Sequence, residues 1–127
     1  MVSPYVKAVL LYASMSGDEL KNSQFFDSLS GGSRESQEEL RASPQDFAAI
    51  SPDRFYAGIS AAIQLHHSIA DPVVPLAWAQ ETCQKLKSAG RLVECFYYDG
   101  ADHTFRKAAI KRYSPRKDAF FANYLKK

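Results

Sequence analysis

Residues 61–75 read AAIQLHHSIADPVVP, an apolar run that passes into a loop containing aspartate and proline. We expect a buried strand over Ala61–His67, because the run is short, rich in apolar side chains and followed by residues that favour turns. His66 and His67 lie at its end, and neighbouring residues of a strand point to opposite faces, so at least one must be buried. We interpret them as hydrogen-bonded structural histidines, since no Cys, Asp or Glu accompanies them at metal-ligand spacing.

The next apolar run, Leu92–Tyr98, predicts a second strand. The intervening segment, Pro75–Ala89, places apolar side chains along one stripe at helical spacing, and Gly90 follows where a helix C-terminus favours glycine. Strand, helix and strand form a βαβ unit, which implies a parallel sheet.

The N-terminal part of the chain extends this pattern. Val6–Ala13 is a nearly continuous apolar run, and it predicts a further strand buried on both faces. The polar segment 18–53 that follows predicts a helical excursion, with a helix over Glu35–Ala42. Ser43 and Pro44 are typical of the N-cap and first turn of another helix.

The C-terminal segment predicts a packed helix that opens at Ser114 and Pro115. The fold class is therefore α/β, with about three parallel strands, flanking helices and a helical insertion after the first strand.

Two loops carry residues with catalytic chemistry, and both follow predicted strands. Asp71 lies in the loop after Ala61–His67, and His103 lies in the loop after Leu92–Tyr98, which reads DGADHTF over residues 99–105. Neighbouring parallel strands end at the same edge of a sheet, roughly 5 to 10 Å apart, so the carboxylate can accept a hydrogen bond from the imidazole. Such a bond fixes the histidine tautomer and stabilises the imidazolium. The alternative is that one is a turn residue and the other a surface loop residue.

Both loops resemble motifs of α/β-hydrolase-fold serine hydrolases, in particular prolyl oligopeptidase-like and acylaminoacyl peptidase-like enzymes and dienelactone hydrolase-like esterases. Residues 67–75, HSIADPVVP, are similar to the H-G-x-x-D-x-x-V-P strand end that carries the acid, and residues 100–103, GADH, to the G-x-x-H end that carries the base. The resemblance implies that Asp71 and His103 belong to a Ser-His-Asp triad that hydrolyses an ester or peptide bond. Ser68 departs from the family, which mostly has glycine there.

The resemblance is strongest over residues 55–125. It implies that residues 1–127 form a single domain equivalent to the C-terminal half of the catalytic domain, with 19–57 as a cap-like helical insertion. No cofactor or metal is implied, and we find no metal, nucleotide or haem motif.

The sequence lacks the G-x-S-x-G turn that presents the nucleophile in this family. Ser60 lies in the loosest match, but it precedes a predicted strand that Asp71 follows, which separates the two by roughly 20 Å. Ser14 and Ser16 lie at the correct edge without a tight turn into a helix. We therefore expect this chain to supply only the acid and base, and to be inactive in isolation.

A second hypothesis is a non-catalytic remnant that acts as a self-associating or partner-binding module. The apolar residues of the first predicted strand would lie at an unprotected sheet edge, which must be covered. A second copy of the chain, giving a dimer or other homo-oligomer, or a complementary N-terminal fragment would cover it.

The composition describes one globular domain: 127 residues, 46% of them apolar, with a formal net charge of +2. This balance does not favour nucleic acid or a membrane as a partner, and no apolar run approaches the roughly 20 residues of a membrane span. Basic residues concentrate in the C-terminal third, where their spacing suits a solvated helix face.

Cys83 and Cys95 belong to no C-x-x-C motif or Cys/His cluster. We interpret them as free thiols in the core and expect a reducing, cytoplasmic environment.

Overall fold

The computed structural model describes residues 5–106 and 108–125. Along the chain it has the elements β1 (Ala8–Tyr12), α1 (Glu19–Leu29), α2 (Arg34–Glu39), α3 (Pro44–Ile50), the 3-10 helix η1 (Pro52–Gly58), β2 (Ala62–Ser68), α4 (Leu76–Ser88), β3 (Val93–Tyr98) and α5 (Ala108–Tyr124). The predicted strands and the helix between the second and third agree with these bounds to within a few residues.

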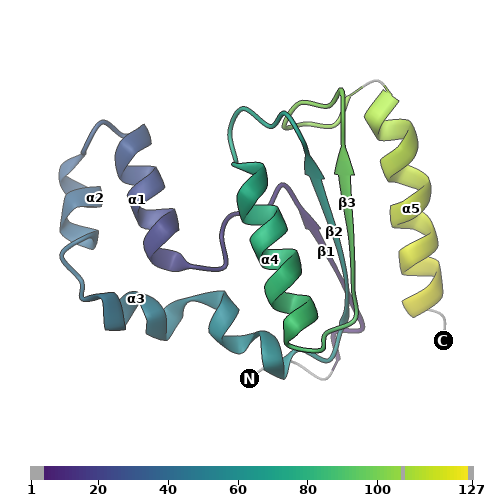
Figure 1. Ribbon diagram of the computed structural model, residues 1–127, viewed down its shortest axis with the longest axis horizontal. Coiled ribbons are helices and arrows are strands. Elements are labelled where there is room, and N and C mark those ends of the chain that lie inside the picture. Colours follow the sequence, from purple (N-terminus) through teal and green to yellow (C-terminus); the bar gives the residue numbers. More distant parts are fainter. Residues whose placement is uncertain (1–4, 107, 126–127) are drawn as a thin grey trace.

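The sheet has the strand order β1-β2-β3, and both strand pairs are parallel, which confirms the predicted fold class. Helix α4 packs against β2 and β3, whereas α5 packs against β1 and β2 from the opposite side (Figure 1). The central strand β2 therefore has a neighbour on each edge and a helix over each face, and all of its residues are buried.

Strand β1 differs from the prediction that it is buried on both faces, since every one of its residues is only half-buried. The reason is its position: within the part of the chain that the structure describes, β1 pairs with β2 alone and forms one edge of the sheet. The apolar sequence therefore predicted a strand correctly, but it did not predict the extent to which that strand is buried.

Helix α5 begins at Ala108, six residues before the predicted opening at Ser114, and Pro115 lies inside it. An internal proline removes one helical hydrogen bond and typically costs about 3 kcal/mol. Packing of the first turns offsets this cost, because Ala109 is buried and the Tyr113 ring contacts three aromatic side chains, those of Tyr12, His66 and Phe105.

The insertion after β1 is helical, as predicted, although its second helix ends at Glu39 rather than at Ala42. Ser43 caps the next helix as expected: its side chain accepts a hydrogen bond from the Asp46 N–H, and the Asp46 carboxylate accepts one from the Ser43 N–H. Pro44 occupies the first turn. These local signals define where α3 begins.

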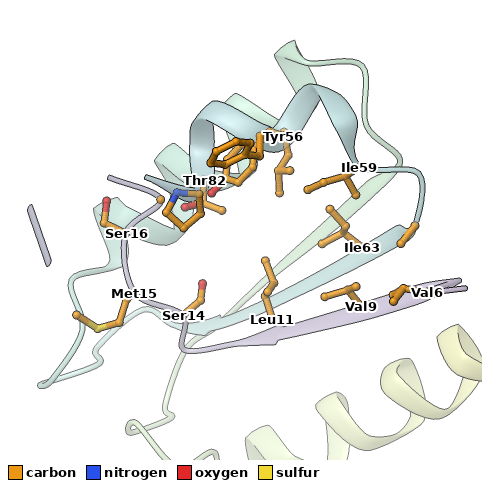
Figure 2. A pocket seen from close by; sticks show the side chains of 15 residues that line it. Val6, Val9, Leu11, Ser14, Met15, Ser16, Tyr56, Ile59, Ile63 and Thr82 are labelled. Carbon is orange, nitrogen blue, oxygen red and sulfur yellow. The ribbon is translucent and has the colours of Figure 1, made fainter. Parts of the chain in front are cut away.

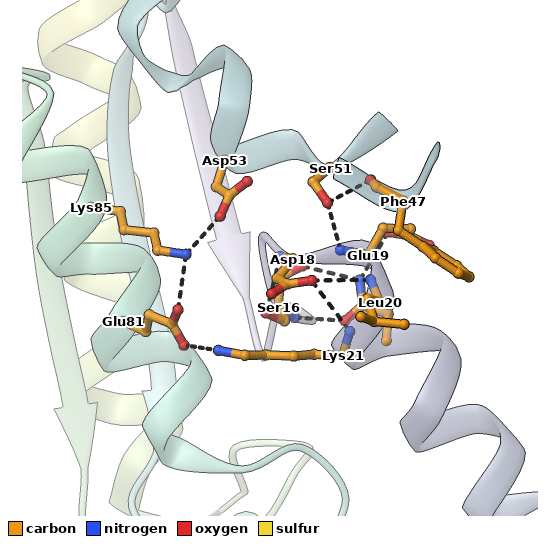
Figure 3. A network of polar contacts seen from close by, with 11 residues as sticks. Ser16, Asp18, Glu19, Leu20, Lys21, Phe47, Ser51, Asp53, Glu81 and Lys85 are labelled. Carbon is orange, nitrogen blue, oxygen red and sulfur yellow. Dashed lines mark hydrogen bonds and ion pairs between the residues drawn. The ribbon is translucent and has the colours of Figure 1, made fainter. Parts of the chain in front are cut away.

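Ion pairs attach the insertion to α4. Lys21 on α1 lies 2.6 Å from Glu81, and Lys85 lies 2.9 Å from Glu81 and 2.6 Å from Asp53 in η1 (Figure 3). Hydrogen bonds from Lys21 and Lys85 hold the pKa of Glu81 below its usual value, and hydrogen bonds to Asp53 and Glu81 raise that of Lys85. The four groups connect two parts of the insertion to the same helix.

The two cysteines form a disulfide, so the prediction of free thiols was wrong. Cys83 on α4 and Cys95 on β3 have their Cα atoms 6.4 Å apart and their sulfurs bonded. Helix α4 packs against β3, so its apolar stripe faces a side chain of the strand that follows it. The prediction of a reducing, cytoplasmic environment was based on free thiols, and the disulfide removes the basis for it.

No helix within the described ranges is both long enough and apolar enough to span a membrane.

Candidate active site

Asp71 lies in the loop between β2 and α4, with its side chain fully inaccessible to solvent. One carboxylate oxygen, Oδ1, accepts hydrogen bonds from the Val73 N–H at 2.8 Å and the Val74 N–H at 2.9 Å. Aspartate followed by proline favours this kind of turn, in which the side chain binds the backbone two and three residues on. The loop therefore fixes the direction of the carboxylate.

His103 lies in the loop between β3 and α5, and its imidazole contacts Asp71. Its Nδ1 is 2.9 Å from Oδ2 and 3.2 Å from Oδ1 of the carboxylate. The acceptor is a carboxylate, so Nδ1 carries the proton and Nε2 is the nitrogen left to accept one. The side chain is 38% exposed, which leaves the ring accessible. The structure brings together the two residues that the sequence singled out.

The carboxyl group of Asp71 is ionised at neutral pH. Burial acts to raise its pKa. This effect is outweighed by hydrogen bonds from Val74, Val73 and His103 and by the charge of His103 when it is protonated, all of which lower the pKa. The result is a pKa below the usual 3.8. A buried negative charge beside Nδ1 is the arrangement that stabilises an imidazolium.

His67, at the end of β2, contacts the loop that carries Asp71. It is fully buried, and its Nε2–H donates a hydrogen bond to the Val74 carbonyl at 3.0 Å. The same nitrogen is 3.8 Å from Oδ2 of Asp71, while Nδ1 has no hydrogen-bond partner. His67 is thus a structural histidine, as predicted, and its contact with the loop that carries Asp71 is a feature that sequence reasoning missed.

His66 points to the opposite face of the sheet and is also structural. Its Nε2–H donates to Gln64 Oε1 at 2.8 Å, and its Nδ1 accepts from the Tyr98 hydroxyl at 2.7 Å. Burial and, to a smaller extent, the charge of Arg116 lower its pKa from 6.5 to about 4, so the ring is neutral at physiological pH. Over residues 5–106 and 108–125, no group of three His, Cys, Asp or Glu residues is arranged to hold a metal ion.

None of the serines weighed as a nucleophile is hydrogen-bonded to His103. Ser60 is exposed just before β2, at the opposite end of that strand from Asp71. Ser16 accepts a hydrogen bond from the Asp18 N–H at 3.1 Å, and the Ser14 hydroxyl is buried without a partner. The sequence argument against Ser60 agrees with its position.

An apolar cavity of about 560 Å³ opens beside β1, on the face of the sheet that α4 covers. Figure 2 shows Val9 and Leu11 of β1 facing it together with Ile63 of β2, with Tyr56 of η1 on the opposite side. Neither Asp71 nor His103 lines it. The cavity is therefore a separate feature from the Asp71–His103 pair.

Several solved structures share this fold. A puromycin-hydrolyzing peptidase of Mycobacterium tuberculosis matches 94% of this chain with a TM-score of 0.74 and 22% identity. The acylaminoacyl peptidase of Pyrococcus horikoshii matches 98% of it with a TM-score of 0.73 and 23% identity. Esterase 2 of Thermogutta terrifontis matches 72% with a TM-score of 0.54 and 24% identity.

The chain spans only part of these proteins: 18% of the first, 21% of the second and 36% of the third. No curated protein matches the sequence. The family model described as the prolyl oligopeptidase family matches residues 13–127. This match covers nearly the whole chain and agrees with the parallel sheet, so the chain belongs to the prolyl oligopeptidase family of serine hydrolases with an α/β-hydrolase fold.

Proposed function

We propose that this chain supplies the acid and the base of a Ser-His-Asp triad that hydrolyses an ester or peptide bond. The observation that supports this most is the contact between Asp71 and His103, in which a buried carboxylate accepts the Nδ1–H of a partly exposed imidazole. The pair leaves Nε2 available for proton transfer, as a general base requires.

In this proposal His103 Nε2 takes the proton of a serine hydroxyl while the serine oxygen attacks the substrate carbonyl. The resulting imidazolium is stabilised by Asp71, which remains ionised. His103 then gives the proton to the leaving alkoxide or amine, and an acyl-enzyme remains. A water molecule, deprotonated by the same nitrogen, releases the acid and restores the serine.

The nucleophile comes from a segment outside these 127 residues, because the sequence has no G-x-S-x-G turn. The coverage of longer relatives supports this proposal, since the matched peptidases are about five times as long as the matched region. Within the described residues β1 pairs with β2 alone, so its outer edge and the apolar cavity beside it provide a surface that such a segment would bury.

A chimera tests the proposed roles. This chain replaces the aligned segment of the Pyrococcus horikoshii acylaminoacyl peptidase, and hydrolysis of p-nitrophenyl esters is measured. We expect activity that falls about 10⁴-fold in kcat on Asp71→Asn and on the order of 10⁶-fold on His103→Ala. Asp118→Asn, which changes an exposed aspartate on α5, is the control. A folded, active chimera that keeps its kcat without His103 would contradict the proposal.

The isolated chain provides a complementary test with a fluorophosphonate probe, which labels activated serines. We expect no labelling, because a base without a nucleophile and oxyanion donors has nothing to activate. Labelling of Ser14, Ser16 or Ser60 would show that the chain contains its own nucleophile.

The second candidate function is a self-associating or partner-binding module without catalysis. The half-buried edge strand β1 and the apolar cavity favour it, since exposed strand edges pair readily with other chains. Its test is the mass of the chain in solution, and a stable monomer at micromolar concentration would count against self-association.

A further inference from the structure

We propose that Ser68 is a positioning residue, whose hydroxyl holds the loop that carries His103 so that the imidazole meets Asp71. The inference deepens the proposed function, since it assigns a residue that serves the same acid–base pair. It rests on the proposed function only for the role of His103 as a base. It concerns the position at which this chain has serine instead of the family's usual glycine.

Ser68 is fully buried at the end of β2, and its hydroxyl donates a hydrogen bond to the Ala101 carbonyl at 2.6 Å. Ala101 is itself buried and lies two residues before His103. Glycine or alanine at position 68 has no donor to offer this carbonyl. A buried carbonyl that loses its hydrogen-bond donor costs about 1 to 3 kcal/mol, and the loop is expected to move rather than leave it unpaired.

The backbone of the loop bends back toward β2 to make this contact. Ser68 is paired with Tyr98 at the end of the parallel ladder, and the Ile69 N–H donates to the Tyr98 carbonyl at 2.9 Å. Gly100 then adopts a left-handed conformation with φ of +63°, which glycine accepts without strain. This turn brings the Ala101 carbonyl above the end of the neighbouring strand.

A second hydroxyl holds the other side of the same loop. The Tyr12 hydroxyl on β1 donates to the carbonyl of His103 itself at 2.9 Å. The Phe105 ring, fully buried, packs against the rings of Tyr12 and Tyr98 at centroid distances of 4.5 and 4.8 Å. The backbone on both sides of Asp102 is thus attached to strands, which sets the direction in which the His103 side chain leaves it.

The position of Ser68 gives this contact its consequence for the acid–base pair. Asp71 follows Ser68 by three residues. The end of β2 therefore positions the acid directly, through the backbone, and the base indirectly, through the hydrogen bond from the Ser68 hydroxyl to the loop of His103. The Nδ1 to Oδ2 distance of 2.9 Å has little tolerance, because hydrogen bonds weaken beyond about 3.2 Å. A displacement of about 1 Å in such a constellation can lower catalysis about 10²-fold.

The test is the tautomer of the neutral His103 ring in the isolated chain, measured by ¹⁵N NMR with labelled histidine. The variants are Ser68→Ala and Ser68→Gly, and His103→Gln assigns the resonances. In the parent chain we expect the Nδ1–H tautomer, because Asp71 accepts from Nδ1. In both Ser68 variants we expect a shift toward the Nε2–H tautomer, which histidine prefers when no partner fixes it.

Ser51→Ala is the matched control. Ser51 is also a buried serine, but it lies in the insertion. Its hydroxyl donates to the Phe47 carbonyl at 2.8 Å and also accepts from the Glu19 N–H at 2.9 Å (Figure 3). Because two hydrogen bonds are removed, we expect a loss of stability in urea unfolding at least as large as in Ser68→Ala, with the His103 tautomer unchanged. A tautomer unchanged in the Ser68 variants, or changed equally by Ser51→Ala, would overturn the proposal.

Tyr12→Phe provides a second variant that keeps the ring packing and removes only the hydroxyl. We expect it to shift the tautomer in the same direction as Ser68→Ala. An unchanged signal would overturn the proposal that hydroxyls of Ser68 and Tyr12 together hold the loop of His103, even if the Ser68 variants do not fold. In the chimera, Ser68→Ala should lower kcat about 10- to 100-fold with KM unchanged. A chimera that is inactive in every form speaks against the proposed function, whereas the NMR result decides the role of Ser68 independently.

Discussion

Neighbouring histidines on β2 have different environments because alternate residues of a strand face opposite sides of the sheet. His67 faces the side of Asp71, where its Nε2–H holds the Val74 carbonyl. His66 faces α5, where Gln64 and Tyr98 satisfy both ring nitrogens. The second environment stabilises only a neutral ring, and this has a consequence for stability in mild acid.

Replacing His66 with Phe should remove part of the pH dependence of unfolding. The pKa of His66 is about 4 in the folded chain and 6.5 as its ordinary value, so the unfolded chain binds more protons between these values. The contribution of neutral His66 to the free energy of unfolding should therefore be fully present above pH 6.5, and the free energy of unfolding should fall by about 3 kcal/mol toward pH 4. Urea unfolding of the parent and of His66→Phe at about pH 7.5 and about pH 4.5 measures this pH-dependent loss. Equal losses in the parent and in His66→Phe would contradict this prediction.

Asp71 acts in a lower pH range. Its pKa is held below 3.8 in the folded chain, so the stability it contributes is present above 3.8 and is lost as the pH falls through the lowered value. Asp71→Asn should cost about 1 to 3 kcal/mol at neutral pH, because a neutral amide oxygen replaces the charged acceptor and the amide nitrogen cannot accept a hydrogen bond. It should also flatten the acid limb of the curve of unfolding free energy against pH.

The control for Asp71→Asn is again Asp118→Asn, which removes the charge of an exposed side chain. The prediction is wrong if the two variants show the same acid limb as the parent.

At the scale of elements, the disulfide between Cys83 and Cys95 ties α4 to the strand that follows it. Replacing both cysteines with serine should lower the free energy of unfolding by about 2 to 4 kcal/mol, because the unfolded chain regains the freedom that the link removes. Urea unfolding with and without a reductant measures the loss. The reductant should destabilise the parent and leave the double variant unchanged, and a parent insensitive to full reduction would contradict the prediction.

The sequence predicted the βαβ unit because its signals are local: apolar runs, a helical stripe and a closing glycine. The disulfide could not be found in this way, since Cys83 and Cys95 come from a helix and a strand, and only their packing brings them together. The start of α5 was wrong for a related reason. Ser114 and Pro115 form a good opening pair locally, yet Tyr113 packs into an aromatic cluster that keeps the preceding turns helical.

The candidate site shows the same division. Asp71 and His103 could be placed together because parallel strands bring their C-terminal loops to one edge of the sheet. Ser68 was visible only as a departure from a motif, and Tyr12 gave no signal, since its contact depends on the path of a loop after β3. Hydroxyl groups that bind loop carbonyls leave no pattern in the spacing of residues.

At the scale of the whole molecule, the side of the sheet beside β1 is one of its edges, and every residue of β1 is only half-buried. Val6 lines the apolar cavity and is 41% exposed. Ile110 on α5 is exposed to a similar extent, 40%, but does not line the cavity. If the chain self-associates through this side, Val6→Lys should shift it to a monomer, because a charged side chain opposes pairing at a strand edge. Ile110→Lys, with matched exposure, should leave the assembly intact.

Sedimentation velocity at micromolar concentration measures both variants against the parent. A parent that is already monomeric, or an assembly that Val6→Lys does not change, would exclude self-association through this side.

The link between α4 and β3 also bears on what a protease can do to the molecule. Trypsin specificity divides this region into peptides 55–85 and 92–106, and the carboxylate lies on the first while the imidazole lies on the second. Each peptide also contains one half of the cystine. A nick in the turn between helix and strand would therefore leave both reactive groups on one covalently joined species, which separates into two masses only after reduction.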